Sequence, residues 1–400
     1  MAMFKNVIAA TAAALMCGSL VEAEVRGYDM IEFSNVGFTG SYTPVKKMSN
    51  LDNNSTCKCE VGDRTWFQGD NAPLNEHLSV HFRGPLSLEK FAFYTSPNFV
   101  INDNSSNSQS WNRSAFYDAS AQTADNVTFM NNQGADSPCV GKALSYASDN
   151  GTSSASSPNV LKADNYVSSD QEYSIFSTVK CPKSGVKNGC GYYRDGIPAF
   201  YGFGGETKMF LFEFKMPTET QSNSSSFEFY DMPAIWLLND KIPRTSQYPI
   251  NANCSCWSSG CGEFDIFEVM NGTERNHLYS TFHTYQGIED LGTGIQSYGY
   301  IPRDTKGTMM GGVIFDSNGN TVSFISNSTS FDQTLSPSAV NSLLRAIPSN
   351  ETYSTKLMSI SGVAPSSSKS KSSGAALSVD QGIWYYVFTA FTAVAHFLLI

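Results

Sequence analysis

The stretch Gly262-Glu263-Phe264-Asp265-Ile266-Phe267-Glu268-Val269 interleaves three carboxylates with aromatic and β-branched side chains. Phe, Ile and Val fit the pleated, half-buried surface of a strand, so the stretch predicts a β-strand. Side chains alternate along a strand, which puts Glu263 and Asp265 on one face. Glu268 joins them only if one extra residue forms a β-bulge between Asp265 and Glu268. We predict this bulge, because clustered carboxylates cost repulsion and desolvation and therefore indicate a functional site.

Short strand patterns recur on both sides of this stretch and are separated by turn residues. They predict strands at residues 78–82, 86–94, 209–216, 227–238, 278–285, 313–316 and 321–325. The last two flank Ser317-Asn318-Gly319-Asn320, whose Asn-Gly step is a strong hairpin signal. A helical pattern covers residues 336–346. Many short strands with turns between them predict an all-β protein, a β-sandwich of the jelly-roll, concanavalin-like kind.

Both ends of the chain carry targeting patterns. Residues 1–23 are expected to be a secretory signal peptide, with a positive residue, an apolar run and a small-residue cleavage site. Residues 374–400 have the order of a GPI-attachment signal, with attachment expected at Ser373 or Gly374. A C-terminal membrane anchor is the alternative, because the apolar tail could span a bilayer. The small residues and the Ser/Lys-rich stalk at 363–373 favour the GPI anchor.

The remaining chain divides by composition. Residues 24–105 are expected to form a small β-rich, cysteine-containing N-terminal region, either separate or supplying the outer strands of one sandwich. Residues 106–165 are polar and rich in Ser and Gly, and are expected to form long, glycosylated loops. Residues 166–362 carry the densest strand signals and are expected to form the sandwich that holds the acidic stretch.

Cysteine usage predicts disulfide bonds. Eight cysteines remain after Cys17 leaves with the signal peptide, and they are Cys57, Cys59, Cys139, Cys181, Cys190, Cys254, Cys256 and Cys261. An even number in a secreted chain implies disulfides, with 105 possible pairings that spacing leaves open. Zinc is disfavoured at the two Cys-x-Cys pairs, because no histidine is near them and the compartment is oxidising. We expect neither a metal nor a cofactor.

Composition is typical of an extracellular β-protein. The chain is 13% aromatic and 16% charged, with a net charge of −10. This balance and the absence of a Lys/Arg cluster argue against nucleic acid as a partner, whereas a neutral polysaccharide is compatible. Asn-x-Ser/Thr sequons predict N-glycosylation at Asn53, Asn54, Asn104, Asn112, Asn126, Asn150, Asn223, Asn271, Asn327 and Asn350. A sequon at Asn253 is disfavoured because its middle residue is Cys254.

Several motifs together resemble a known family. Glu263-Phe264-Asp265-Ile266-Phe267-Glu268 resembles the bulged Glu-x-Asp-x-x-Glu signature of family 16 glycoside hydrolases, in their laminarinase-like branch. Pro233-Ala234-Ile235-Trp236 resembles the strand before that signature, and Thr281-Phe282-His283-Thr284 the histidine-bearing strand after it. The order of these blocks, with Cys57–Cys59 and His81-Phe82-Arg83-Gly84-Pro85 ahead of them, resembles a GPI-anchored fungal cell-wall glycosyl hydrolase family. The resemblance extends over most of the mature chain.

The resemblance implies roles for the site residues. Glu263 would be the nucleophile, Glu268 the acid/base and Asp265 a supporting acid that hydrogen-bonds the nucleophile. His283 could orient Glu268 or bind sugar, although a lone histidine is often only packed. Trp236 and Trp257 are expected to bind substrate as sugar platforms, with a core position as the alternative. Weaker platform candidates are Tyr192, Tyr193, Tyr201 and Phe203.

The expected function is therefore a secreted enzyme of the cell wall, held by a GPI lipid in the outer leaflet of the plasma membrane. It would cleave β-glucan, with endo-β-1,3 cleavage and retention, during wall remodelling. A transglycosylase that uses the same site is one alternative. A non-catalytic, glucan-binding wall mannoprotein is another, although binding alone would not need paired Glu residues. The crowded Cys254, Cys256 and Cys261 depart from ordinary laminarinases, which leaves substrate length and cleavage pattern open.

Overall fold

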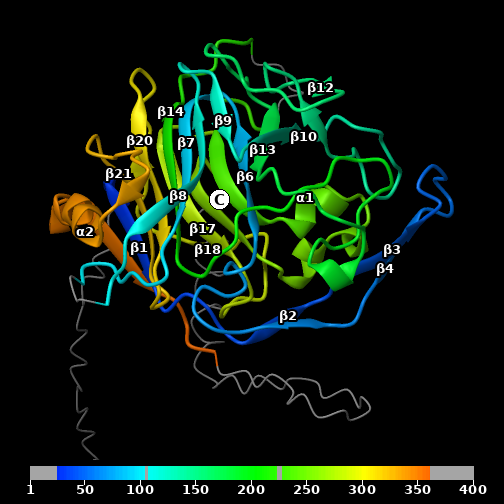
Figure 1. Ribbon diagram of the computed structural model, residues 1–400, viewed down its shortest axis with the longest axis horizontal. Coiled ribbons are helices and arrows are strands. Elements are labelled where there is room, and N and C mark those ends of the chain that lie inside the picture. The colour runs from blue at the N-terminus through cyan, green and yellow to red at the C-terminus, as the bar shows by residue number, and fades with distance from the viewer. Residues whose placement is uncertain (1–24, 104–106, 223–227, 361–400) are drawn as a thin grey trace, which may run out of the picture. The chain divides into compact units, whose positions relative to one another are not determined.

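Two large β-sheets pack face to face in the computed structural model, which describes residues 25–103, 107–222 and 228–360 (Figure 1). The expected signal peptide, stalk and GPI signal lie outside these residues, and so do Ser373, Gly374, Asn104 and Asn223. The all-β sandwich is confirmed, because helices are few and short.

The first sheet has the strand order β22 (Thr334–Leu335), β8 (Trp111–Asp118), β7 (Ser87–Thr95), β14 (Lys208–Lys215), β20 (Met309–Phe315), β21 (Thr321–Ile325), β1 (Met30–Ser34) and β23 (Thr352–Lys356), with β9 (Thr123–Asp125) paired to β8. β1 and β23 run parallel, and the other strand pairs described in this sheet are antiparallel.

The second sheet has the order β12 (Ser154–Ala155), β11 (Ser145–Ala147), β10 (Thr128–Asn131), β13 (Glu172–Phe176), β6 (Leu78–Arg83), β15 (Ala234–Asn239), β16 (Glu263–Glu268), β17 (His277–His283) and β18 (Ile295–Gln296), with β19 (Ile301–Pro302) paired to β17. The acidic strand β16 thus lies inside the sheet, between β15 and β17. Two small hairpins complete the strands: β2 (Gly40–Tyr42) with β5 (Thr65–Phe67), and β3 (Val45–Ser49) with β4 (Lys58–Val61).

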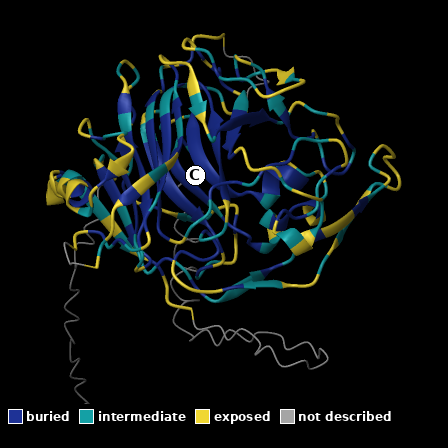
Figure 2. Ribbon diagram, viewed as in Figure 1, coloured by how far each residue is buried: buried dark blue, intermediate teal, exposed yellow. Residues whose placement is uncertain are grey.

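Alternation along the strands builds the core. On β14, Phe210, Phe212 and Phe214 face the other sheet, while Met209 and Leu211 face outward. The outward pair is covered by α2 (Pro337–Arg345), the helix expected at residues 336–346. Both faces of β14 are therefore buried, and the interior strands of this sheet are largely dark blue in Figure 2, whereas β9 and β23 have exposed residues. A cleft lies on the outer face of the second sheet.

The remaining helices are short. They are α1 (Lys241–Thr245), η1 (Val186–Asn188), η2 (Ala252–Cys254), η3 (Cys256–Ser259) and η4 (Ser349–Glu351). The sequence pattern did not predict α1. Within the ranges that the structure describes, no helix has the length and apolar character needed to cross a bilayer.

Most expected strands are confirmed, with two corrections. Residues 227–238 were expected to be one strand, but β15 begins at Ala234 because the preceding residues form a turn. Residues 106–165 were expected to be long loops, yet β8 to β12 lie there. On β8, Ala115 and Tyr117 face the core between the sheets and Trp111 packs with the residues of α2, and the polar residues between Trp111 and Ala115 obscured this strand signal.

The described residues of this N-terminal region, 25–103, share the sandwich with the rest of the described chain. β6 lies between β13 and β15, and β7 lies between β8 and β14, so both take interior positions in the sheets. The described residues form one compact unit. The sequons within it differ in exposure: Asn53, Asn54, Asn112, Asn271, Asn327 and Asn350 are exposed, and Asn126 and Asn150 are half-buried with their side-chain amides hydrogen-bonded.

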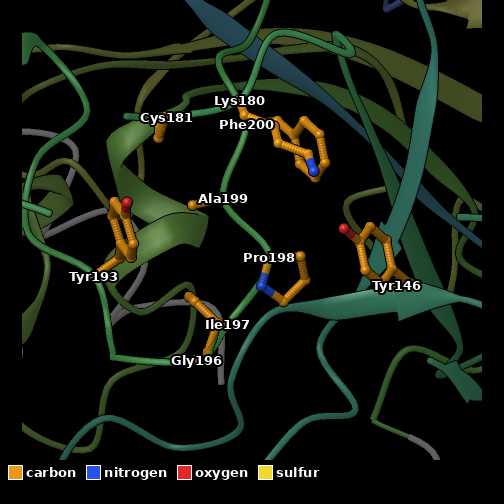
Figure 3. Close-up of a pocket in the computed structure, with 9 residues that line it drawn as sticks. All are labelled: Tyr146, Lys180, Cys181, Tyr193, Gly196, Ile197, Pro198, Ala199 and Phe200. Carbon is orange, nitrogen blue, oxygen red and sulfur yellow. The ribbon is translucent and has the colours of Figure 1, made fainter. Parts of the chain in front are cut away.

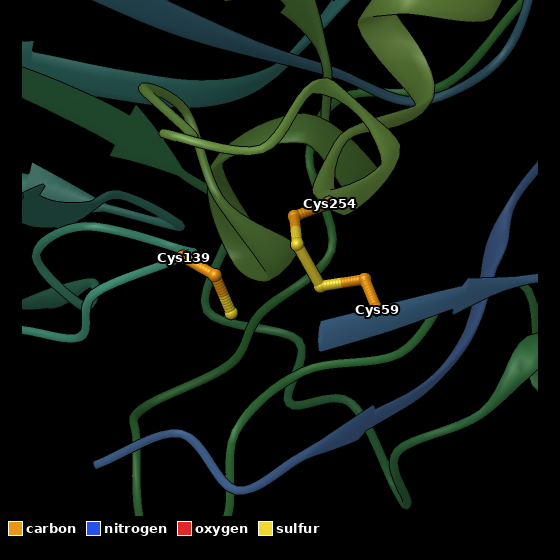
Figure 4. A group of neighbouring side chains, drawn as sticks. All are labelled: Cys59, Cys139 and Cys254. Atoms are coloured by element: carbon orange, nitrogen blue, oxygen red, sulfur yellow. A yellow bond between two sulfur atoms is a disulfide. The ribbon is translucent and has the colours of Figure 1, made fainter. Parts of the chain in front are cut away.

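Four disulfides confirm the prediction from the cysteines. They join Cys57 to Cys139, Cys59 to Cys254, Cys181 to Cys190 and Cys256 to Cys261. The sulfur atoms of Cys59, Cys139 and Cys254 lie within 4.8 Å of one another (Figure 4). All three are committed to S–S bonds, so they offer no thiolate to a metal. The first two disulfides tie the β3–β4 hairpin to loops far away in the sequence.

Candidate active site

The predicted bulge is present in β16. Asp265 pairs with Trp236 while Phe267 pairs with the next residue, Ile235, which leaves Ile266 without a partner on β15. The register against β17 shifts at the same place. Phe264, Ile266 and Phe267 consequently all face the hydrophobic core. The three carboxylates Glu263, Asp265 and Glu268 line one cleft on the opposite, outer face.

The cleft has a volume of about 600 Å³. It is lined by the six main predicted site residues, Trp236, Trp257, Glu263, Asp265, Glu268 and His283. The weaker platform candidates Tyr192, Tyr193, Tyr201 and Phe203 do not line it. Gln247, Tyr248 and Pro249 form part of its wall, and Phe229 and Met270 line it near Glu268. Trp236 is only 5% exposed and lies against the ring of His81, so it forms part of the cleft floor.

Glu263 is held at the cleft by a neighbouring loop. The indole Nε1 of Trp257 donates a hydrogen bond to Glu263 Oε2. Burial raises the pKa of Glu263, while the charge of His283 and the Trp257 hydrogen bond act in the opposite direction. Trp257 lies on η3, between Cys254 and Cys261, and both of these cysteines are disulfide-bonded. The disulfides thereby restrain the residue that orients Glu263.

Asp265 and His283 form a buried pair. His283 Nε2 lies 2.8 Å from Asp265 Oδ2, and His283 Nδ1 donates to the carbonyl of Leu291. Burial lowers the pKa of His283, but the charges of Asp265 and Glu263 outweigh it and raise the pKa to about 10. Burial and the repulsion of Glu268 raise the pKa of Asp265. Because the Leu291 carbonyl can only accept, the Asp265–His283 contact shares one additional proton at neutral pH.

His283 does not orient Glu268, which corrects one of its two predicted roles. Glu268 instead receives a hydrogen bond from Arg83, whose Nη2 lies 2.9 Å from Glu268 Oε1. Arg83 is itself fixed, because its Nε donates to the carbonyl of Met232 and its guanidinium lies over the ring of Phe229. Glu268 is therefore oriented from β6, on the side of the sheet away from His283.

A further carboxylate lies beyond Arg83. Glu172 on β13 is opposite Arg83 in the strand register, and its oxygens accept hydrogen bonds of 2.9 and 2.7 Å from the Tyr248 hydroxyl. Burial raises the pKa of Glu172, and the charge of Arg83 lowers it. Both glutamates stabilise the charge of Arg83, which offsets the cost of burying its guanidinium.

This geometry allows a defined set of reactions. Glu263 and Glu268 leave the same strand face and flank Asp265, and each has a different hydrogen-bonding partner. Paired carboxylates in a cleft can act as nucleophile and acid/base on a glycosidic bond.

Comparison with known proteins places the chain in a family. A family model described as "Cell wall protein YJL171C/Tos1, C-terminal" matches residues 109–343, and one described as "Cell wall protein YJL171C/Tos1, N-terminal" matches residues 29–96. The chain belongs to the YJL171C/Tos1 family of cell wall proteins.

Three relatives in this family match most of the chain. The Saccharomyces cerevisiae protein named "Probable circularly permuted 1,3-beta-glucanase YJL171C" is 66% identical over 94% of each chain. The Candida albicans protein named "Probable circularly permuted 1,3-beta-glucanase PGA52" is 51% identical, covering 89% of this chain and 91% of its own. The Saccharomyces cerevisiae protein named "Probable circularly permuted 1,3-beta-glucanase TOS1" is 33% identical, covering 79% and 90%. No solved structure gives a significant match.

The sequence alone did not predict three residues at or beside this cleft: Arg83, Glu172 and Tyr248. A signal for Arg83 was present, because Leu78, Val80 and Phe82 alternate as core residues and put Arg83 on the opposite face with Ser79 and His81. Glu172 and Tyr248 carry no comparable pattern. They reach the site through the pairing of β13 with β6 and through a loop after α1.

Proposed function

We propose that this protein is a cell-wall glycosidase that cleaves β-1,3-glucan with retention of configuration. The observation that carries the proposal is the bulge in β16, which brings Glu263, Asp265 and Glu268 to one cleft. The names of the relatives support the substrate. Retaining enzymes place their two carboxyl groups about 5–5.5 Å apart, which is within reach of two Glu side chains on one strand face.

In the first step, the Glu263 carboxylate attacks the anomeric carbon while the Glu268 carboxylic acid protonates the departing glycosidic oxygen. The C–O bond to the leaving sugar breaks, and an ester forms between the glycosyl unit and Glu263. In the second step, the Glu268 carboxylate takes a proton from water, whose oxygen attacks the same carbon and releases Glu263. The Asp265–His283 pair supports the nucleophile, because the positive charge of His283 favours ionised Glu263.

The arrangement of the first and last described strands is compatible with a circularly permuted chain. β1 and β23 are neighbours, and Met30 lies opposite Thr352 in the register. Circular permutation needs the chain ends to lie close together, so that the original ends can be joined and new ends opened elsewhere. This adjacency agrees with the names of the relatives and is independent of the cleft geometry.

Matched carboxylate variants test the assignment. In the ectodomain, Glu263→Gln and Glu268→Gln should each lower kcat on β-1,3-glucan oligosaccharides by ~10³-fold or more. Glu213→Gln is the control, because Glu213 lies on β14 and pairs with Lys90. Azide should rescue Glu263→Ala and give a glycosyl azide of inverted configuration. Glucanase activity that survives both Gln substitutions contradicts the proposal.

The same assay separates the two alternatives. A transglycosylase would produce oligosaccharides longer than the substrate, because a sugar hydroxyl replaces water in the second step. A wall mannoprotein that only binds glucan would retain the polymer and show no turnover in any form.

The proposed location is the cell wall and the outer leaflet of the plasma membrane, reached by secretion and a GPI anchor at Ser373 or Gly374. The family and the C-terminal sequence pattern support this. Phosphatidylinositol-specific phospholipase C should release the protein from membranes. Continued retention after lipase treatment, with a control GPI protein released, would indicate a membrane-spanning anchor.

A further inference from the structure

A second hollow, of about 310 Å³, opens on the described part of the molecule. Tyr146, Lys180, Tyr193, Pro198 and Phe200 are among its lining residues (Figure 3). The rings of Tyr146 and Tyr193 are on opposite sides of the opening in Figure 3, and both are half-buried. No residue of this hollow also lines the cleft that holds the carboxylates.

The strand register puts this hollow on the same sheet face as the carboxylates. Tyr146 on β11 pairs with Met130, and Met130 with Ser174. The row then continues through His81, Trp236 and Asp265 on β6, β15 and β16. The core-facing neighbours of these residues lie between the two sheets, so the whole row is on the outer side of the second sheet, where other parts of the chain cover Met130, Ser174 and His81. Five strand steps of about 4.8 Å separate Tyr146 from Asp265 by roughly 24 Å.

The walls of the hollow are held in place before any ligand binds. The Cys181–Cys190 disulfide anchors Cys181, which lines the hollow beside Lys180. Arg194, next to Tyr193, donates hydrogen bonds to carbonyl oxygens of three residues, Ala135, Val140 and Gly141. Buried Arg244 donates to the carbonyl oxygens of Cys190 and Phe200. A prearranged site loses less conformational entropy on binding.

The lining suits a neutral sugar. Aromatic rings offer apolar faces to sugar C–H groups, and their hydroxyls can hydrogen-bond. The exposed ammonium of Lys180 adds a donor. None of the described lining residues has a carboxylate, so the hollow lacks the paired acids that glycosidic cleavage requires.

We propose that the hollow between Tyr146 and Tyr193 is a distal binding site for a glucan chain whose scissile segment occupies the cleft. This inference rests on the proposed function for its substrate class. A long chain that bridges both sites gains affinity because the second contact is intramolecular. A short oligosaccharide reaches only one site and gains nothing.

Chain length therefore tests the site. In the full-length protein, Tyr146→Ala/Tyr193→Ala should raise KM for polymeric β-1,3-glucan by roughly tenfold or more, and leave kcat/KM for laminaritriose unchanged. The single substitution Tyr193→Ala should give a smaller change in the same direction. Tyr193 lies outside the core clusters, so this variant should fold like the wild type. Tyr298→Ala is the control, because Tyr298 is 71% exposed and lines neither cavity. An unchanged KM for the polymer, or an equal loss on both substrates, would overturn the inference.

A binding measurement keeps this inference distinct from the proposed function. The Glu263→Gln protein should sediment with insoluble β-1,3-glucan, and the added Tyr146→Ala/Tyr193→Ala substitutions should reduce the bound fraction. If the wild type fails to hydrolyse glucan while the tyrosines still control retention, the enzyme proposal falls and the binding site stands. Retention that soluble mannan competes away and soluble β-1,3-glucan does not would contradict the assigned ligand.

Discussion

Neighbouring groups shift the pKa of Glu263 in opposite directions. Burial and the nearby Glu268 favour its protonated form, whereas the His283 charge and the Trp257 hydrogen bond favour the carboxylate. The pKa of Glu263 is raised as a net result, so its carboxylate is protonated at a higher pH than that of an ordinary glutamate. Trp257 is the partner that can be changed without altering any charge.

Trp257→Phe should shift the acidic limb of the kcat/KM profile to higher pH. The substitution removes a hydrogen bond that lowers the pKa of Glu263, so Glu263 will be protonated at a higher pH and activity will be lost earlier on acidification. The profile is measured on a short β-1,3-glucan oligosaccharide, with the basic limb as the internal reference. An acidic limb that stays in place while kcat falls uniformly would assign Trp257 to sugar binding alone.

The bulge in strand β16 determines which of its side chains line the cleft. A regular strand would put Ile266 and Phe267 on opposite faces, and one of the two would line the cleft. The observed register buries both in the core and leaves the three carboxylates together. One additional residue thus satisfies the core and the cleft at the same time.

Ile266→Ala and Phe267→Ala should both destabilise the fold, by about 2–5 and about 3–5 kcal/mol, because each leaves a cavity in the core. Ile250→Ala is the matched control, since Ile250 is 73% exposed. Thermal and denaturant unfolding of the ectodomain measure the losses. If either substitution in β16 were tolerated as well as Ile250→Ala, that side chain would not face the core and the bulge would be absent.

The stability of the whole fold depends on pH through a proton held by the Asp265–His283 pair. The Asp265–His283 pair holds this proton in the folded state up to a pKa of about 10, while an unfolded histidine releases it near its ordinary value of about 6.5. The folded protein binds more protons in this window, so the stability contributed by the pair is complete below about pH 6.5 and is lost as pH rises towards 10.

His283→Gln should flatten the decline of the melting temperature between pH 6.5 and 10. The substitution lowers overall stability, because Asp265 loses its partner, and the informative quantity is therefore the slope with pH. Melting temperatures of both proteins across this range give the comparison. Parallel slopes in the wild type and the variant would show that His283 carries no additional proton in the folded state.

Much of the fold could be predicted because it depends on local patterns. Alternation predicted β6, β14, β16 and β17, and the Asn-Gly step predicted the β20–β21 hairpin. The strands of residues 106–165 were missed, because β8 exposes polar residues between its buried ones. The disulfide pairs could not be chosen, since Cys59 and Cys254 are 195 residues apart and meet only in the folded chain.

The sequence by itself determined the strand with Glu263, Asp265 and Glu268 and the need for one bulge, because side-chain alternation is a local property of the backbone. Only the tertiary structure decided which partner each carboxylate receives. Trp257 holds Glu263, His283 holds Asp265, and Arg83 holds Glu268. These contacts depend on the order in which β6, β15, β16 and β17 lie side by side, and strand order is set by the burial of the whole core.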